Sequence, residues 1–257
     1  MTHKARKRFG QNFLTDHSII SNILSCLQMH TGEHWVEIGP GQGALTKPLL
    51  EKAGMLDVVE LDRDLVVLLT KQFANAQNLH IHSADALQFD FSSLTKNNEK
   101  YRLIGNLPYN ISTPLLFHLL NYPSCISDMH FMLQKEVVDR ICASPNSKSY
   151  GRLSVMLQYY CEAEHLFDVP PECFDPVPKV TSAIIRLVPH IKPPVELASV
   201  ENFKSLVAHA FSQRRKTIRN SLKKLMNEEV FSELGIDPTA RAENLSLLDF
   251  ARLSNQI

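Results

Sequence analysis

One tetrapeptide in the sequence is suited to a particular reaction, Asn106-Leu107-Pro108-Tyr109. The exocyclic amine of adenine is a poor nucleophile because its lone pair is delocalised into the ring. Acceptors on its two N–H groups return that density to nitrogen, and the Asn106 side-chain oxygen and the Leu107 carbonyl, held by the rigid Pro108, are suited to this. Tyr109 could stack on the purine and face the positive charge that develops on nitrogen. The tetrapeptide therefore predicts methyl transfer to adenine, although alone it is also compatible with an ordinary strand-to-helix turn.

A glycine-rich turn earlier in the chain predicts a nucleotide-like cofactor. Gly39 and Gly41 follow an apolar run and would let the backbone turn tightly and approach a ligand. Glu60 and Asp85 end the next two apolar runs, where they could bind ribose hydroxyls and an adenine amino group. Ligands of open α/β sheets bind at the carboxyl ends of the strands, so these residues should converge on one cleft.

Two alternatives to this cofactor site follow from the same residues. The turn also satisfies the G-x-G-x-x-A pattern of nicotinamide enzymes, in which Glu60 would bind the ribose. Glu60 and Asp85 could also simply cap the helices that follow them. A nicotinamide enzyme has no use for a turn that binds an amine, so the combination with Asn106 favours S-adenosylmethionine as the cofactor.

The elements that position these residues alternate in the manner of an α/β fold with a mostly parallel sheet. The seven predicted strands are His34 to Ile38, Asp57 to Leu61, Leu79 to His82, Tyr101 to Gly105, Met129 to Leu133, Glu164 to Val169 and Ala183 to Val188. The predicted helices include Leu65 to Phe73, Pro114 to Leu120 and Glu136 to Ala143, and Thr15 or Asp16 should cap another helix before the first strand.

The proline-rich segment 189–194 should end the sheet, since proline lacks the donor that a strand needs. We therefore predict a methyltransferase domain over residues 1–188, a linker over 189–194 and a small, all-helical RNA-binding domain over 195–257. In the last of these, Lys216, Arg219 and Lys223 recur at helical spacing, on a different face from an apolar stripe.

Basic residues are concentrated near the two ends of the chain, although the 257 residues carry no formal net charge. We predict that both clusters contact RNA phosphates, with a solvated surface as the alternative for each residue. The predicted RNA-binding residues are Arg6, Lys7, Arg8, Arg215, Lys216, Arg219 and Lys223.

Several other classes of protein are disfavoured. The five cysteines are odd in number and scattered, which argues against a disulfide framework or a zinc knuckle and favours a reducing cytoplasm. His80 and His82 would share one face of a strand, but no further ligand completes a metal site, so we predict none. No apolar run is long enough to cross a membrane, and no apolar segment follows the basic start of the chain.

With these motifs in this order, the chain resembles the ribosomal RNA adenine dimethyltransferase family from Arg6 to the last helix. The resemblance implies a Rossmann-like S-adenosylmethionine methyltransferase fold. Gln11-Asn12-Phe13-Leu14 resembles the family's N-terminal element, which implies that Asn12 and Leu14 contact the cofactor together with Gly39, Glu60, Asp85 and Asn106. Phe174, in Phe174-Asp175-Pro176-Val177-Pro178-Lys179-Val180-Thr181-Ser182, resembles a second aromatic residue that packs on the target adenine opposite Tyr109.

Three further stretches resemble the bacterial branch that modifies the small ribosomal subunit. They are residues 130–137, 150–155 and 211–220. This implies two adjacent adenosines in the 3′-terminal hairpin loop of 16S ribosomal RNA as the substrate and the immature small subunit as the partner of a monomeric enzyme. Two alternatives stay open: an enzyme of large-subunit RNA of the antibiotic-resistance type, and a non-catalytic assembly or transcription factor on the same fold.

Overall fold

The computed structural model describes residues 1–257 except 1–5, 7–9, 96–98 and 214. The contacts divide the chain into two compact units. The first, here called the sheet unit, comprises Met1–Val138 and Glu164–Pro189, and the second, the helical unit, comprises Asp139–Ala163 and His190–Ile257. No helix in the part of the chain that the structure describes is long and apolar enough to span a membrane.

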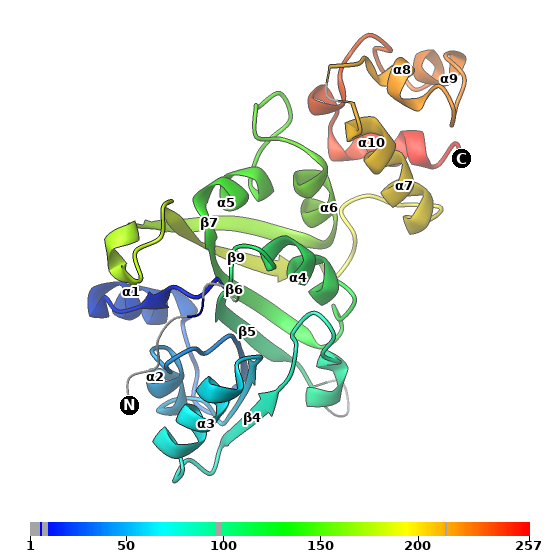
Figure 1. Cartoon of the computed structure of the whole chain (residues 1–257). Helices are drawn as coiled ribbons and strands as arrows, with labels where there is room; N and C mark the ends of the chain where they lie inside the picture. The colour runs from blue at the N-terminus through cyan, green and yellow to red at the C-terminus, as the bar shows by residue number, and fades with distance from the viewer. Residues whose placement is uncertain (1–5, 7–9, 96–98, 214) are drawn as a thin grey trace. The chain divides into compact units, whose positions relative to one another are not determined.

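A seven-stranded sheet in the order β4-β3-β2-β5-β6-β9-β7 forms the centre of the sheet unit (Figure 1). Its strands are β2 (His34–Ile38), β3 (Met55–Glu60), β4 (Leu79–Ser83), β5 (Tyr101–Asn106), β6 (Ile126–Gln134), β7 (Cys161–Val169) and β9 (Ser182–Pro189). The pairs from β4 to β6 are parallel, and β9 is antiparallel to β6. All seven predicted strands are present, and the predicted mostly parallel α/β fold is confirmed.

Helices flank this sheet and begin where the sequence supplies a cap. They are α1 (His17–Leu27), α2 (Thr46–Leu50), α3 (Arg63–Gln72), the short 3-10 helix η2 (Phe91–Leu94), α4 (Ser112–Leu119) and α5 (Lys135–Ile141). Asp16, one of the two predicted caps of α1, accepts from the N–H groups of Ser18 and Ile19. Asp62 caps α3 in the same way, through Asp64 N.

The two faces of the sheet are buried by different elements. On one face, Trp35, Leu56 and Ile104 pack in a single cluster with Ile23 of α1 and Leu49 of α2. The other face carries an edge-to-face series of rings that joins His82, Phe89, Phe91, His118 and Tyr122. Because both faces are covered, the carboxyl ends of the strands are the part of the sheet that is open to a ligand.

The helical unit is held by its own aromatic core. Its helices are α6 (Arg152–Tyr160), α7 (Val200–Phe211), α8 (Ile218–Leu222), α9 (Glu229–Glu233), η4 (Ala242–Asn244) and α10 (Leu247–Ser254). Tyr159 packs on Phe203, and Phe211 packs on both Tyr150 and Phe250. Ser246 and Asp249 form a capping box that fixes the start of α10.

Two expectations for the C-terminal part differ from the structure. Residues 139–163, which we placed in the first domain, group with the C-terminal residues by their contacts. The prediction that one helix carries Lys216, Arg219 and Lys223 on one face is wrong. The helix α8 spans only Ile218–Leu222, and Lys216 lies before it. The chain is extended at Thr217, which pairs with Arg241 in an isolated bridge, and this interrupts the helical spacing.

Candidate functional site: a cavity at the carboxyl ends of the strands

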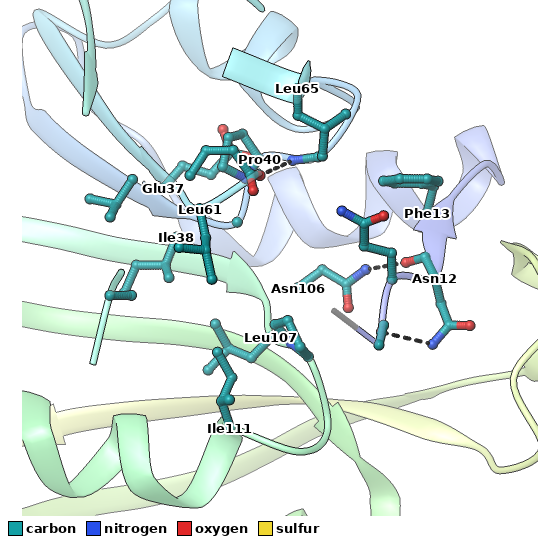
Figure 2. A pocket seen from close by; sticks show the side chains of 18 of the residues that line it. Asn12, Phe13, Glu37, Ile38, Pro40, Leu61, Leu65, Asn106, Leu107 and Ile111 are labelled. Carbon is teal, nitrogen blue, oxygen red and sulfur yellow. Dashed lines mark hydrogen bonds between the residues drawn. The ribbon is translucent and has the colours of Figure 1, made fainter. Parts of the chain in front are cut away.

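A cavity of about 360 Å³ lies at the carboxyl ends of β2, β3, β4 and β5. Its lining includes all seven residues predicted to bind the cofactor, Asn12, Leu14, Gly39, Gly41, Glu60, Asp85 and Asn106. It also includes the whole of the tetrapeptide 106–109. Figure 2 shows Asn106 and Leu107 at this cavity, with Asn12 of the N-terminal arm, here the described residues before α1, next to Asn106. The predicted convergence of strand ends on one cleft is therefore present.

The glycine turn after β2 follows a backbone path that favours glycine. Gly39 and Gly41 have φ angles of +67° and +58°. A Cβ on Gly41 would lie 3.0 Å from the ring of Phe13, so there is no room for a side chain where the arm passes over the turn. Glu60 fixes the turn from the next strand, because its Oε2 accepts from Gly41 N at 3.3 Å and its Oε1 from Asp62 N at 2.8 Å.

Three carboxylates line the cavity in different environments. Burial raises the pKa of Glu60, and the hydrogen bonds from Asp62 and Gly41 oppose this. Glu37 is 2% exposed, and burial raises its pKa to about 8 although Thr46 donates to it at 2.6 Å. Asp85 accepts from Leu87 N at 2.9 Å within a turn, and the next helical element, η2, is capped by Asp90, so Asp85 does not cap a helix as the alternative interpretation had it. Glu37 was missed by the sequence reasoning, although it lies only two residues before Gly39.

The orientation of the Asn106 amide is set by the N-terminal arm. Its Nδ2 donates to the backbone carbonyl of Asn12 at 2.9 Å (Figure 2). Since the nitrogen is engaged there, Oδ1 is the amide atom left for an incoming donor, as methyl transfer to an amine requires. The partner is 94 residues away in sequence, so no local pattern indicates it.

The rest of the tetrapeptide forms a tight turn between β5 and α4. Leu107 N donates to Met132 O at 3.2 Å, and Ile111 N donates to Pro108 O at 3.1 Å. Tyr109 is half-buried, and its hydroxyl lies 2.7 Å from Oγ of Ser182 at the start of β9. Burial raises the pKa of the Tyr109 phenol, which is therefore protonated at neutral pH.

The arm that closes the cavity is tied down at several points. The strand β1 (Phe13–Leu14) pairs antiparallel with β8 (Phe174–Asp175). Arg6, which we predicted to contact RNA, forms ion pairs with Asp62, at 2.9 Å, and with Asp64. Gln11 donates to the same Asp62 at 3.2 Å. Arg6 also donates its backbone N–H to Gln11, which lines the cavity, so Arg6 lies one residue away from the lining.

Phe174 occupies a different environment from the one that the resemblance implies. It is 3% exposed, packs in the core cluster and is absent from the described residues that line the cavity. Its register partner Leu14 does line the cavity, so Phe174 lies one strand away from it. Stacking of Phe174 on a base remains a prediction.

Four predicted RNA-binding residues lie on the helical unit. Arg215, Lys216, Arg219 and Lys223 are all exposed. Arg219 also forms an ion pair with Glu228 at 2.9 Å, which partly offsets the positive charge that Arg219 presents to RNA phosphates. Lys7 and Arg8 lie outside the described residues.

His80 and His82, which we considered as metal ligands, lie beside an aspartate. Asp57 Oδ1 is 2.5 Å from Nε2 of His82 and 3.6 Å from Nδ1 of His80, and Oδ2 is 2.7 Å from Nε2 of His34. Over the described parts of the chain, no group of three or more His, Cys, Asp or Glu side chains is arranged to hold a metal ion.

The comparison with known families gives a full-length match. The model of the ribosomal RNA adenine dimethylases matches residues 2–257. The chain belongs to this family. Membership in the ribosomal RNA adenine dimethylase family confirms the predicted class of enzyme and the reaction of adenine dimethylation.

Relatives and solved structures agree with this membership. A protein named ribosomal RNA small subunit methyltransferase A from Methylococcus capsulatus is 54% identical over 257 residues, which cover 100% of this chain and 99% of the relative. The protein of the same name from Pseudomonas aeruginosa is 52% identical over 255 residues, covering 99% and 95%. This is the branch that the sequence motifs favoured.

The fold is shared with two solved structures of similar length. A dimethyladenosine transferase from Plasmodium falciparum superposes with a TM-score of 0.81 at 24% identity, covering 94% of this chain and 95% of that one. The 23S rRNA methyltransferase ErmE superposes with a TM-score of 0.74 at 27% identity, covering 95% and 99%. The predicted Rossmann-like methyltransferase fold is thus confirmed.

Proposed function

We propose that this adenine dimethylase uses S-adenosylmethionine to dimethylate N6 of two adjacent adenosines in the 3′-terminal hairpin loop of 16S ribosomal RNA. The names of its relatives support the small subunit as the target. The observation that carries the chemistry is the Asn106 amide, whose nitrogen is held by Asn12 so that its oxygen is available within the cavity. We further propose that the enzyme acts as a cytoplasmic monomer on the immature small subunit.

The cavity fits S-adenosylmethionine in size and in donor set. Its volume of about 360 Å³ is within the range of small-molecule sites, roughly 300–1,000 Å³. The backbone at Gly39 is open enough for close approach of a ligand, since the nearest atom to a Cβ there would be Asn106 O at 3.7 Å. The two Glu60 oxygens accept from backbone N–H groups and, with about four lone-pair sites between them, keep capacity for a ribose hydroxyl. Asp85 also lines the cavity, where it could accept from the cofactor's amino group.

The residues of the tetrapeptide prepare the target amine. Oδ1 of Asn106 and the carbonyl of Leu107 accept from its two N–H groups, which concentrates the lone pair on N6. Tyr109 stacks on the base and aligns N6 with the donor. S-adenosylmethionine, when bound, supplies a methyl group activated on a sulfonium sulfur, so that transfer forms the N6–C bond and breaks the S–C bond. The extra proton on nitrogen then leaves to solvent.

The RNA must present an unstacked base to this cavity. A stacked base cannot reach a recessed donor, and a loop base costs less to swing out than a paired one. We assign backbone contacts with the RNA to Arg215, Lys216, Arg219 and Lys223, all of which are exposed on the helical unit.

Methyl mapping on purified subunits tests the proposed function. Undermethylated small subunits and, separately, large subunits are incubated with the enzyme and labelled S-adenosylmethionine, and the modified bases are mapped. We expect two neighbouring N6,N6-dimethyladenosines near the 3′ end of the small-subunit RNA. Label in large-subunit RNA alone would favour the antibiotic-resistance alternative. A chain that binds the small subunit but transfers no methyl group would support the assembly-factor alternative.

A further inference from the structure

Ser182 lies against the catalytic turn without belonging to it. Its Oγ is 2.7 Å from the hydroxyl of Tyr109, which is the length of a sound O–H···O hydrogen bond. Ser182 is fully buried, with 0% exposure, and lies 73 residues further along the chain. A buried hydroxyl that pairs with the ring expected to hold the substrate is a candidate positioning group.

The backbone around Ser182 is rigid. Ser182 is the first residue of β9, and its register partner is Gln134, the last residue of β6. The serine is therefore fixed in a central antiparallel pair of the sheet, at the end where the cavity lies. Tyr109, by contrast, belongs to the turn between β5 and α4, to which its ring is attached through Cβ. The hydrogen bond to Ser182 gives the ring a second fixed point.

The two methyl transfers depend on this ring to different extents. Before the first transfer, the target amine has two N–H groups, which both Asn106 Oδ1 and the Leu107 carbonyl can accept. Afterwards it carries one methyl group and one N–H, so only one acceptor can be satisfied. The base then loses a hydrogen bond, and its alignment depends more on stacking against Tyr109.

We propose that Ser182 is a positioning residue that fixes the Tyr109 ring for the second methyl transfer. The inference rests on the proposed function of the cavity. It assigns the completion of dimethylation, rather than the first methylation, to a hydroxyl outside the catalytic tetrapeptide. Methylation of the monomethylated base would thus depend more than methylation of the unmodified base on how firmly the Tyr109 ring is held.

Product ratios in three variants test this inference. Ser182→Ala and Tyr109→Phe each remove one hydroxyl and keep the ring, and the double variant removes both. We expect the ratio of dimethyl to monomethyl adenosine at a fixed time to fall about fivefold in each single variant, since a hydrogen bond contributes about 1 kcal/mol. The double variant should show the same fall as either single one, because the two groups act through one bond.

Thermal unfolding separates positioning from a merely structural role. Each single variant leaves a hydroxyl without its partner and should unfold at a lower temperature, whereas the double variant, with both groups removed, should recover part of that loss. A product ratio that recovers with stability in the double variant would overturn the proposal. A ratio that remains low while stability recovers would support it. Ser182→Thr, which retains the hydroxyl, should restore the dimethyl product.

A matched control is available in Ser254→Ala. Ser254 is 1% exposed, and its hydroxyl donates to Ala251 O at 2.9 Å within α10. It should leave the product ratio unchanged. If the wild-type chain dimethylates adenosine and Ser182→Ala gives the wild-type ratio, only the role of Ser182 fails. If the wild-type chain modifies no adenosine, the proposed function fails with it.

Discussion

The proposed chemistry depends most directly on the side-chain amide of Asn106. Its nitrogen donates to Asn12, so its oxygen is available to the target amine. We expect Asn106→Ala to lower kcat by about 10²- to 10³-fold, as for loss of one preorganised hydrogen-bonding group in other active sites. Steady-state methylation kinetics measure this change in kcat. Asn121→Ala, which removes an exposed amide that donates to His118 O, should keep wild-type kcat, and an equal loss in both variants would contradict the role.

The protonation of Glu37 predicts how stability varies with pH. Burial raises its pKa to about 8 in the folded chain, whereas a free glutamate titrates at about 4.3. Between these values the folded state binds one more proton than the unfolded state, so this group's contribution to stability falls as pH rises from about 4.3 to about 8. Urea unfolding at pH 5, 7 and 9 should show this fall in the wild-type chain and a smaller one in Glu37→Gln.

The control for this prediction is an exposed glutamate after the neighbouring helix. Glu51→Gln should follow the wild-type curve at every pH, because Glu51 is exposed. Parallel curves for wild type and Glu37→Gln would show that Glu37 does not hold the extra proton.

Among the elements, the N-terminal arm is expected to control how long the cofactor stays bound. Arg6 ties the arm to Asp62, whose side chain is 1% exposed, and to Asp64. Because Arg6 itself is about one-third exposed, we expect Arg6→Ala to weaken cofactor binding by only about fivefold, or about 1 kcal/mol. Titration calorimetry gives the Kd, and rapid dilution gives the dissociation rate.

The matched control for the arm is Arg63→Ala, an exposed arginine at the start of α3 next to Asp62. It removes the same charge near the same helix end without releasing the arm. Equal Kd values for the two variants would show that the effect is one of general charge.

The strands could be predicted from sequence more completely than their ends. β2 matches its predicted bounds, because its apolar run is uninterrupted from Trp35 to Ile38 except for Glu37. β6 begins at Ile126, three residues earlier than predicted, because Asp128 interrupts the apolar pattern on which the prediction of the strand depended. This aspartate is tolerated there because Arg102 donates to both of its oxygens at 2.8 Å.

The site was predictable to the extent that its residues lie in local motifs. The glycine turn, Glu60, Asp85 and Asn106 each follow a predicted strand, and parallel strands bring their carboxyl ends together. Their order in the sequence therefore predicted the position of the cavity that they line. The missed groups are those defined by partners distant in sequence. Ser182 and the Arg6–Asp62 ion pair depend on how non-neighbouring elements meet, which spacing along the chain does not encode.

At the scale of the whole molecule, RNA binding and cofactor binding should respond to different substitutions. Arg215, Lys216 and Lys223 are exposed on the helical unit. Replacing all three with alanine should weaken RNA binding and reduce the slope of log K against log salt by about 2, at about 0.7 for each phosphate contact. Filter binding at several salt concentrations measures the slope.

The control for the salt experiment uses the sheet unit. Lys47, Lys52 and Lys71 are also exposed there, and their triple alanine variant changes the net charge by the same amount. It should retain the wild-type slope. An equal reduction in both triple variants would assign RNA binding to overall charge rather than to the helical unit.

The pairing of β1 with β8 also sets the order in which the enzyme matures on the ribosome that synthesises it. Thr15, next to β1, donates to Cys173, which is synthesised 158 residues later. Domains generally fold from the N-terminus as they emerge, but this segment has no strand to join until residues 174–175 have left the exit tunnel. Phe13 and Leu14 are therefore among the last residues of the sheet unit to dock, and a nascent chain gains its methyl-donor cavity only when that unit is nearly complete.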